Sequence, residues 1–391
     1  MKITFVTDTY SPQANGVATT LERLVNGLRE REHEVDVIRP AVLACEEEGL
    51  KVPSFGLPGY KEVRFGFPMK LVLQSRWYRN RPDVIYVATE TPLGASAISA
   101  ARALGIPAAS GFHTNFQQYM AHYQMPLLEK AAIKYLRRLH NRSTCTFVPS
   151  HDVIQQLDES GFENLELLPK GVDTKLFSPK KRSAALRASW GATEGSRVGL
   201  YVGRIAAEKN LPVVVKAFAE IQKRFPDFRG VFVGDGPRLA DLRKEHPEFV
   251  YAGVRRGEEL AAYYASADFF LFPSTTETFG NVTLEGMASG LAVVAYDYAA
   301  ARQHIVNGEN GFSVPFDDEE AFLRASLDVA QGDLSEIRQA ARSSARKVRW
   351  KKVVRRFEKQ LRKLIKHDLS SPDPDSHEAP NLNRDTAPLT T

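Results

Sequence analysis

The sequence predicts an α/β protein made of two doubly wound, parallel-sheet domains. With 391 residues, 43% of them hydrophobic, the chain is long and apolar enough to bury two separate cores. Short apolar segments alternate along it with segments whose apolar residues recur at helical spacing, which is the pattern of repeated βαβ units. Several predicted strands run directly into loops with glycine or charged residues, and ligands bind at that edge of a doubly wound sheet.

The first half begins with a complete βαβ unit. Residues 2–6 form a predicted strand, residues 8–17 a turn-rich loop, and residues 35–38 the next strand. The helix between them has one apolar face, formed by Leu21, Leu24, Val25 and Leu28. Further strands are predicted at residues 84–88, 108–111, 145–148 and 165–168, with helices beginning at Pro92 and Ser150. We therefore assign residues 1–172 to an N-terminal domain.

The second half, residues 173–345, repeats this organisation. Strands are predicted at residues 198–202, 230–233, 250–253 and 269–272, and helices at residues 281–289 and 317–330. The turn at residues 234–237 lacks the Gly-x-Gly-x-x-Gly spacing of a dinucleotide fingerprint, so we interpret it as a turn near a nucleotide. Residues 346–367 predict a basic amphipathic helix, and the Pro-, Asp- and Ser-rich residues 368–391 a disordered tail.

Positive charge is concentrated in that last helix. The net charge is +5, and residues 346–367 contain 11 Lys or Arg with a single acid, Glu358. Such a localised excess argues against a protein that coats nucleic acid. A shorter basic stretch spans residues 130–142. Both stretches fit docking on an anionic membrane surface, and a solvated helix face is the alternative for each.

Other features of the chain predict a cytoplasmic protein. No apolar run reaches the roughly 18–20 residues that a spanning helix needs, and the first strand begins without a signal region. Cys45 and Cys145 have no metal-ligand spacing and predict no disulfide framework.

Polar residues gather where the strand at residues 269–272 gives way to a helix. Glu277 lies in the loop and Glu285 on the helix, while Phe279, Gly280 and Asn281 stand where unpaired helix N–H groups point outward. Such a junction suits an anion, and the two carboxylates could bind hydroxyls of a sugar or ribose. On spacing alone, two solvated surface acids are an equal alternative.

Three other strand ends carry candidate site residues. Gly203 and Arg204 follow the strand at residues 198–202, and Lys209 stands close behind, which gives two cations for two phosphates. Gly16 begins the first helix and would let a diphosphate or sugar approach the backbone, although an ordinary turn has the same pattern. His113 follows the strand at residues 108–111, where a structural histidine is the alternative.

Residues 277–290 resemble the nucleotide-sugar signature of the retaining glycosyltransferases of family four. The other motifs of that family are matched in the same order along the chain, by Asn15-Gly16, by His113-Thr114, and by Gly203-Arg204 with Lys209. The family usually has a Gly-Gly pair where this chain has Asn15-Gly16, so only Gly16 is carried over. The resemblance implies the GT-B fold, two Rossmann-like domains with an active site in the interdomain cleft. In that fold the last helix crosses back onto the N-terminal domain.

The resemblance also implies a reaction: retaining, metal-independent transfer of a hexose, mannose or glucose, from a UDP- or GDP-sugar to a hydroxyl of a membrane lipid. It implies no cofactor, and a place at the inner face of the cytoplasmic membrane. It assigns catalysis to His113, Arg204, Lys209 and Glu277. It assigns donor binding to a partly overlapping set: Gly16, Gly203, Arg204, Lys209, Glu277, Phe279, Gly280, Asn281 and Glu285. A polysaccharide or soluble acceptor, a sugar-nucleotide 2-epimerase and a non-catalytic scaffold are the alternatives.

Overall fold

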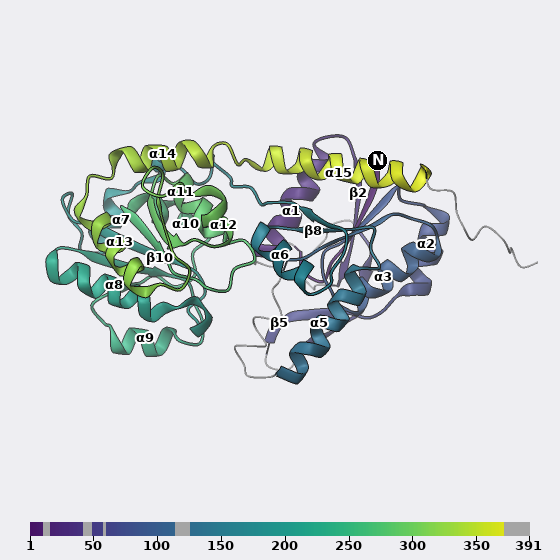
Figure 1. Cartoon of the computed structure of the whole chain (residues 1–391), viewed down its shortest axis with the longest axis horizontal. Helices are drawn as coiled ribbons and strands as arrows, with labels where there is room; N and C mark the ends of the chain where they lie inside the picture. The colour runs from purple at the N-terminus through teal and green to yellow at the C-terminus, as the bar shows by residue number, and fades with distance from the viewer. Residues whose placement is uncertain (11–15, 42–48, 58–59, 114–125, 371–391) are drawn as a thin grey trace, which may run out of the picture.

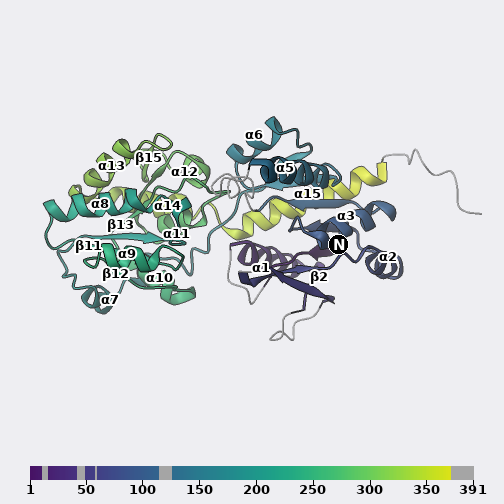
Figure 2. The ribbon, with the colours of Figure 1, turned by 90° about the horizontal axis from the view of Figure 1, so that it is seen from below.

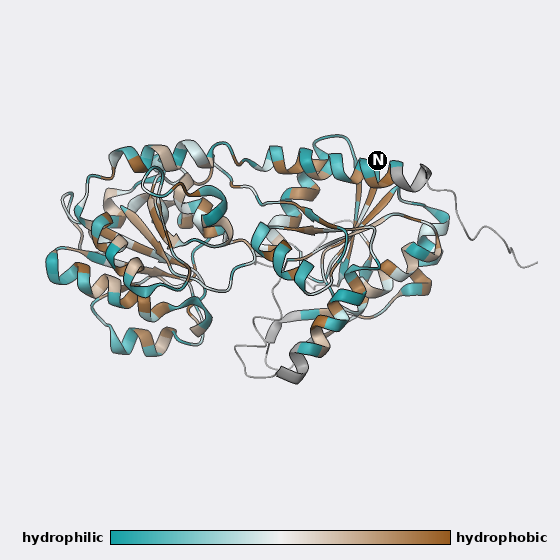
Figure 3. Cartoon of the chain, viewed as in Figure 1, coloured by the Kyte–Doolittle hydropathy of each residue, from teal (hydrophilic) through white to brown (hydrophobic). Residues whose placement is uncertain are grey.

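Two α/β domains lie side by side along the longest axis of the molecule (Figure 1). A computed structural model describes residues 1–10, 16–41, 49–57, 60–113 and 126–370. Each domain is built around a parallel sheet with helices on both faces, so the predicted fold class is confirmed. In Figure 3 the strands inside both domains are mostly hydrophobic, while the helices present hydrophilic residues outward.

The N-terminal sheet has seven strands in the order β3-β2-β1-β6-β7-β8-β9, and every neighbouring pair is parallel. The chain order of the strands reverses between β1 and β6, which makes this the switch point of the sheet. The strands are β1 (Lys2–Val6), β2 (Glu34–Pro40), β3 (Lys51–Val52), β6 (Val84–Val87), β7 (Ala108–Gly111), β8 (Cys145–Val148) and β9 (Leu165–Leu167). The helices are α1 (Gly16–Arg29), α2 (Lys70–Arg79), α3 (Pro92–Ala103), α5 (Pro126–His140) and α6 (His151–Glu159).

The C-terminal sheet has six strands in the order β12-β11-β10-β13-β14-β15, again parallel, with its switch point between β10 and β13. Its strands are β10 (Val198–Val202), β11 (Arg229–Val233), β12 (Val250–Tyr251), β13 (Phe269–Phe272), β14 (Ala292–Tyr296) and β15 (Phe312–Val314). The helices around it are α7 (Ala184–Ser189), α8 (Leu211–Arg224), α9 (Leu239–Glu245), α10 (Gly257–Ser266), α11 (Asn281–Ala288), α12 (Ala299–His304), α13 (Glu319–Gln331) and α14 (Ser335–Ala345).

Parts of the structure differ from the sequence predictions. The antiparallel hairpin of β4 (Ser54–Leu57) and β5 (Tyr60–Gly66) was not predicted, because proline and glycine interrupt its alternating pattern. The final helix, α15, spans Trp350–Ser370 and so begins and ends later than the predicted residues 346–367. The predicted tail therefore does not begin at residue 368, and residues 371–391 lie outside the described part.

Helix α15 joins the two domains by leaving the C-terminal domain and packing on the N-terminal one (Figures 1 and 2). Its apolar stripe, Val353, Val354, Phe357 and Leu361, is buried in the core that α1 and β1 line. A Cβ atom on Gly27 of α1 would lie 2.5 Å from Val354, so the glycine permits this close approach. Each such buried side chain contributes roughly 1.5–3 kcal/mol. The predicted return of the last helix is therefore confirmed.

The two basic stretches lie on opposite sides of the N-terminal domain. In Figure 1, α15 runs along the upper side of the sheet and α5 lies below it, and Figure 2 shows α5 from that lower side. Both helices expose their charges, because their apolar residues, Leu136 and Leu139 on α5 among them, are buried. Among the described residues, no helix is both long and apolar enough to cross a membrane.

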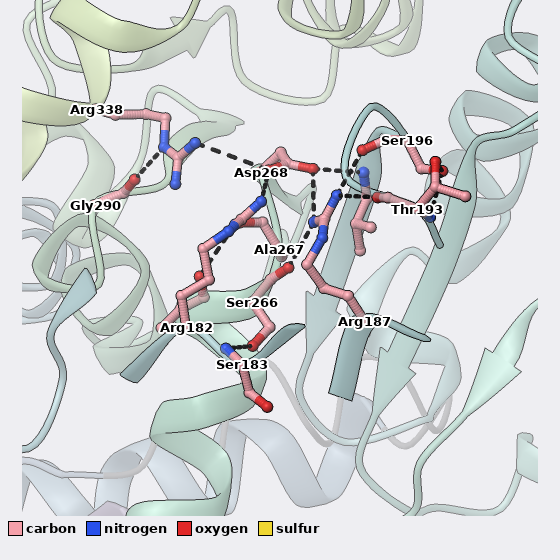
Figure 4. Close-up of polar contacts among 12 residues, drawn as sticks. Arg182, Ser183, Arg187, Thr193, Ser196, Ser266, Ala267, Asp268, Gly290 and Arg338 are labelled. Atoms are coloured by element: carbon pink, nitrogen blue, oxygen red, sulfur yellow. Dashed lines mark hydrogen bonds and ion pairs between the residues drawn. The ribbon is translucent and has the colours of Figure 1, made fainter. Parts of the chain in front are cut away.

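A polar cluster around Asp268 ties the segment after residue 178 to the C-terminal sheet (Figure 4). Asp268 immediately precedes β13, and its carboxylate accepts hydrogen bonds from Arg182 at 2.8 Å and Arg187 at 3.0 Å. It also accepts the backbone N–H of Val198 at 2.9 Å, which fixes the start of β10. The side chain of Arg187 is 6% exposed, so Asp268 neutralises a buried charge. The cluster lies at the amino ends of the strands, the edge opposite their carboxyl ends.

Replacing Asp268 by Ala should lower the stability of the protein by about 3–5 kcal/mol, because Arg187 would remain charged and buried without its partner. In a domain of this size the melting temperature should then fall by roughly 6 °C or more. Differential scanning calorimetry measures the shift. The matched control is Asp241→Ala, which removes an ion pair with Arg238 whose side chains are 58% and 55% exposed. Equal melting temperatures for the two variants would contradict the assignment.

Candidate active site

The predicted site residues meet where the two sheets turn their carboxyl edges toward each other. Arg204 follows β10 and Glu277 follows β13, the two strands that flank the C-terminal switch point. From the other domain, His113 follows β7, and its backbone carbonyl accepts a hydrogen bond from Thr278 Oγ1 at 3.2 Å. The side-chain nitrogen of Asn281 lies 3.7 Å from the position that a Cβ atom on Gly16 would occupy. Residues of both domains therefore face each other between the two sheets, and this interdomain region is called the cleft below.

Glu277 and Lys209 form an ion pair inside this cleft. Lys209 Nζ lies 2.5 Å from Glu277 Oε1, and Ser274 Oγ donates to the same oxygen at 2.8 Å. The side chain of Lys209 is 12% exposed and that of Glu277 is 18% exposed, so solvent screens the ion pair weakly. Among the described residues, Glu277 Oε2 has no hydrogen-bond donor and can accept hydrogen bonds from a ligand's hydroxyl groups.

Arg204 presents an exposed guanidinium just beyond the end of β10. Its side chain is 42% exposed, and Nη1 lies 3.5 Å from the buried carboxylate of Glu208. The loop before Arg204 is tightly packed, because a Cβ atom on Gly234 would lie 1.9 Å from the carbonyl oxygen of Gly203. These two glycines let the ends of β10 and β11 approach closely. Arg204 is thus held at the strand end, with its donors available to an anion.

Helix α11 directs its amino end into the same cleft. Gly280 precedes it with a φ of +83°, a left-handed conformation that favours glycine. The N–H groups of the first helical turn, beginning at Asn281, carry the partial positive charge of a helix terminus. Phe279 is 1% exposed and packs in the domain core, so its part in ligand binding is restricted to its backbone. The sequence correctly predicted this helix start.

Glu285 lies on α11, one turn after the start of the helix. Its carboxylate accepts a hydrogen bond from Tyr264 Oη at 3.1 Å. Burial raises the pKa of its carboxyl group to about 7, and the hydrogen bond from Tyr264 opposes the shift. The carboxyl therefore titrates near neutral pH. An ionised carboxylate accepts two hydrogen bonds from neighbouring hydroxyl groups, as a ribose presents them.

His113 is held in place by a contact with strand β6 of the N-terminal sheet. Tyr86 Oη lies 2.7 Å from His113 Nε2, while Nδ1 is buried and has no hydrogen-bond partner among the described residues. Burial lowers the pKa of the imidazole to about 3, and the charges of Lys170 and His140 add to the effect. The ring is therefore neutral at physiological pH.

Lys170 is a site residue that the sequence analysis missed. It follows β9, is 7% exposed and, with His113, lines a small pocket whose other walls are largely apolar. Burial lowers its pKa to about 8, and the charge of Glu277 opposes the shift. The sequence signal for Lys170 was a cation two residues after a predicted strand, which is also the position of Arg204.

No three His, Cys, Asp or Glu side chains of the described segments come close enough together to hold a metal ion. The polar groups that the cleft offers are cations, backbone N–H groups and two separated carboxylates. This set is suited to a phosphorylated, hydroxyl-rich ligand.

Comparison with known proteins agrees with this chemistry. The profile described as Glycosyltransferase Family 4 matches residues 14–176, and that described as Glycosyl transferases group 1 matches residues 196–331. A GDP-mannose-dependent alpha-mannosyltransferase of Corynebacterium glutamicum is 32% identical over 84% of this chain and 80% of its own. An alpha-monoglucosyldiacylglycerol synthase of Streptococcus pneumoniae is 31% identical over 76% of this chain and 71% of its own.

The fold has close structural neighbours as well. Anabaena HepE, solved in complex with UDP, superimposes with a TM-score of 0.73 at 17% identity, over 93% of this chain and 100% of that one. Two facing Rossmann-like domains with a shared cleft define a GT-B protein, so the predicted fold is confirmed. The chain belongs to the group 1 glycosyltransferases of family 4, and it is a glycosyltransferase.

Donor affinity should depend on pH through Glu285. Its pKa near 7 leaves the carboxyl mostly ionised at pH 8 and mostly protonated at pH 6, and the ionised form is the better hydrogen-bond acceptor. Affinity for a nucleotide sugar should therefore fall about tenfold between pH 8 and pH 6. Calorimetric titration with the intact nucleotide sugar at several pH values measures this. Glu285→Gln should bind more weakly at pH 8 and lose the pH dependence. The same slope in both proteins would exclude the role.

Proposed function

We propose that this glycosyltransferase moves a hexose from a nucleoside diphosphate sugar to a hydroxyl group of a membrane lipid, with retention at the sugar carbon. The observation that carries the proposal is the cleft in which Arg204, Lys209 and the start of α11 face His113 of the other domain. The printed names of the relatives, a GDP-mannose-dependent mannosyltransferase and a glucosyldiacylglycerol synthase, support this donor class and a lipid acceptor.

The cations and the helix terminus account for departure of the nucleotide. As the bond to the sugar breaks, negative charge grows on the diphosphate, and Arg204, Lys209 and the N–H groups of α11 stabilise it. Glu277 holds Lys209 through Oε1 and keeps Oε2 for hydroxyl groups of the sugar. Glu285 binds the ribose. These groups supply the leaving-group stabilisation without a divalent metal.

His113 faces the sugar from the N-terminal domain and does not act as a nucleophile. Its neutral ring suits a site where the reacting carbon gains positive charge, because an imidazolium would repel that carbon. The acceptor hydroxyl then attacks from the face that the leaving group vacates and passes its proton to the oxygen of the departing diphosphate, which gives retention. The first donors to test are GDP-mannose, which the mannosyltransferase's name gives, and UDP-glucose, which a structure of HepE contains.

His113→Ala should bind the nucleotide sugar with parental affinity and transfer the hexose about 10²–10³ times more slowly, because it removes a contact made at the reacting end alone. Transfer to lipid vesicles is assayed with GDP-mannose and UDP-glucose in the presence of a chelator. Arg204→Ala is the matched comparison, and it should lose nucleotide affinity as well. Release of free nucleoside diphosphate without an acceptor would favour the epimerase alternative, and activity that requires an added divalent ion would refute the metal-free mechanism.

We further propose that α5 docks this enzyme on an anionic membrane, at the inner face of the cytoplasmic membrane, with the lipid as acceptor partner. Lys130, Lys134, Arg137 and Arg138 are exposed on α5. Tyr135 of the same helix donates to the backbone carbonyl of Glu90 at 2.9 Å, and Glu90 follows β6 at the carboxyl edge of the sheet. Docking through α5 would therefore bring the acceptor side of the cleft close to the lipid. Helix α15 lies on the opposite side, where its charges serve solubility.

Charge reversal tests which helix docks. Lys134→Glu with Arg138→Glu should weaken binding to anionic vesicles at least about tenfold, because each basic residue near such a surface contributes about 1 kcal/mol. The matched control on α15, Lys359→Glu with Lys363→Glu, should bind as the parent does. Sedimentation with anionic and neutral vesicles at low and high salt provides the measurement. Loss of binding in the α15 variant alone would reverse the assignment.

A further inference from the structure

Tyr86 is a buried tyrosine whose hydroxyl reaches the active-site histidine. It lies on β6, is fully buried, and its ring packs at 5.1 Å from that of Phe5 and 5.0 Å from that of Phe357 on α15. These aromatic contacts fix the ring, so the position of the hydroxyl is determined by the core. Its Oη lies 2.7 Å from His113 Nε2, which follows the neighbouring strand β7.

The backbone beside this hydrogen bond leaves room for it. A Cβ atom on Gly111 would lie 2.1 Å from Tyr86 Oη and 2.6 Å from His113 Nε2. Any side chain at residue 111 would therefore displace one of the two groups. The glycine at the end of β7 is thus matched to the Tyr86–His113 contact.

The direction of the hydrogen bond follows from the surroundings of Tyr86. Burial, with the charge of Glu90, raises the pKa of the phenol well above its usual value, so the hydroxyl keeps its proton. Among the described residues, His113 Nε2 is its one hydrogen-bond partner. If Nε2–H donated to the phenol oxygen, the phenol hydrogen would be buried without an acceptor, at a cost of about 1–3 kcal/mol. Tyr86 therefore donates and Nε2 accepts.

A neutral imidazole that accepts at Nε2 carries its hydrogen on Nδ1. Nδ1 is buried, has no partner among the described residues, and belongs to a ring that lines the pocket beside Lys170. Its N–H group is thus a donor for which the described protein provides no acceptor. An oxygen atom of a bound ligand can supply one.

We propose that Tyr86 is a positioning residue, which holds His113 in the Nδ1–H tautomer so that the imidazole donates one hydrogen bond to an oxygen of the bound sugar donor. The inference rests on the proposed role of His113 in the transfer. Tyr86 itself contacts neither substrate. It acts through the orientation and protonation of the ring above it.

Tyr86→Phe tests this, because it keeps the packed ring and removes the hydroxyl. Its kcat should fall about 10- to 100-fold, less than the loss in His113→Ala, while the KM for the donor stays within about twofold. In the His113→Ala background, Tyr86→Phe should have no further effect, since the two residues act as a unit. The control is Tyr263→Phe, a buried tyrosine that packs on Trp190 in the other domain, and it should keep the parental kcat.

Nitrogen-15 NMR of the imidazole supplies a readout that a merely structural role would not change. In the parent, His113 should show a protonated Nδ1 and an unprotonated Nε2, and Tyr86→Phe should shift it toward the other tautomer. The His113→Ala spectrum assigns the signal. A protonated Nε2 in the parent would overturn the proposal even if the variant failed to fold.

The kinetic outcomes separate the two hypotheses. Parental kcat in Tyr86→Phe with a large loss in His113→Ala overturns the positioning role and leaves the function of His113 in place. Parental kcat in both variants overturns the role of His113, and the inference on Tyr86 with it. Loss in Tyr86→Phe that adds fully to the loss in His113→Ala would mean that the hydroxyl acts elsewhere, which also overturns the proposal.

Discussion

Parallel pairing of the strands is the constraint on which the whole arrangement depends. Because all strands of a parallel sheet end at the same edge, the loops that follow them lie along that carboxyl edge, called the rim here. The reversal of strand order leaves a gap between two of these loops. Arg204 and Glu277 flank that gap in the C-terminal sheet. The N-terminal sheet presents His113 and Lys170 at its own carboxyl edge. A site built from both rims requires that the two edges face each other.

Contacts between the domains maintain that facing arrangement. Helix α15 packs its apolar stripe into the N-terminal core while α14, which precedes it, packs on α11 of the C-terminal domain. Asp152 of α6 accepts the backbone N–H of Ala299 at 2.8 Å and pairs with Arg302. Thr278 reaches the carbonyl of His113 directly beside the proposed reacting centre. The last contact joins the loop after β13 to the loop after β7, so the positions of the two domains are coupled.

Local patterns in the sequence were sufficient for much of this structure. The strands at residues 198–202 and 269–272 have the predicted bounds, and Lys209, Glu277 and the start of α11 meet as their positions after strands indicated. Each of these features is encoded within a short stretch. The basic C-terminal helix was recognised as amphipathic, but composition could not determine which surface its apolar stripe covers.

Features that depend on distant residues were not predictable in the same way. Tyr86 and His113 are 27 residues apart and meet because β6 and β7 are neighbours, a pairing that no local pattern specifies. The packing of Phe357 on Tyr86 joins the C-terminal helix α15 to the core of the N-terminal domain. Lys170 belongs to the cleft through the position of β9 at the edge of the sheet. Tyr86, which no motif marks, becomes a functional candidate only when the topology is known.

The central claim is that one nucleotide sugar spans both rims, with its diphosphate on the C-terminal domain and its sugar against the N-terminal domain. A crystal structure of the protein with its bound nucleotide sugar tests this most directly. The account predicts diphosphate oxygens within about 3 Å of Arg204, Lys209 and the first N–H groups of α11, ribose hydroxyls on Glu285, and the sugar between Glu277 and His113. A diphosphate bound away from both cations, or a sugar directed away from His113, would contradict it.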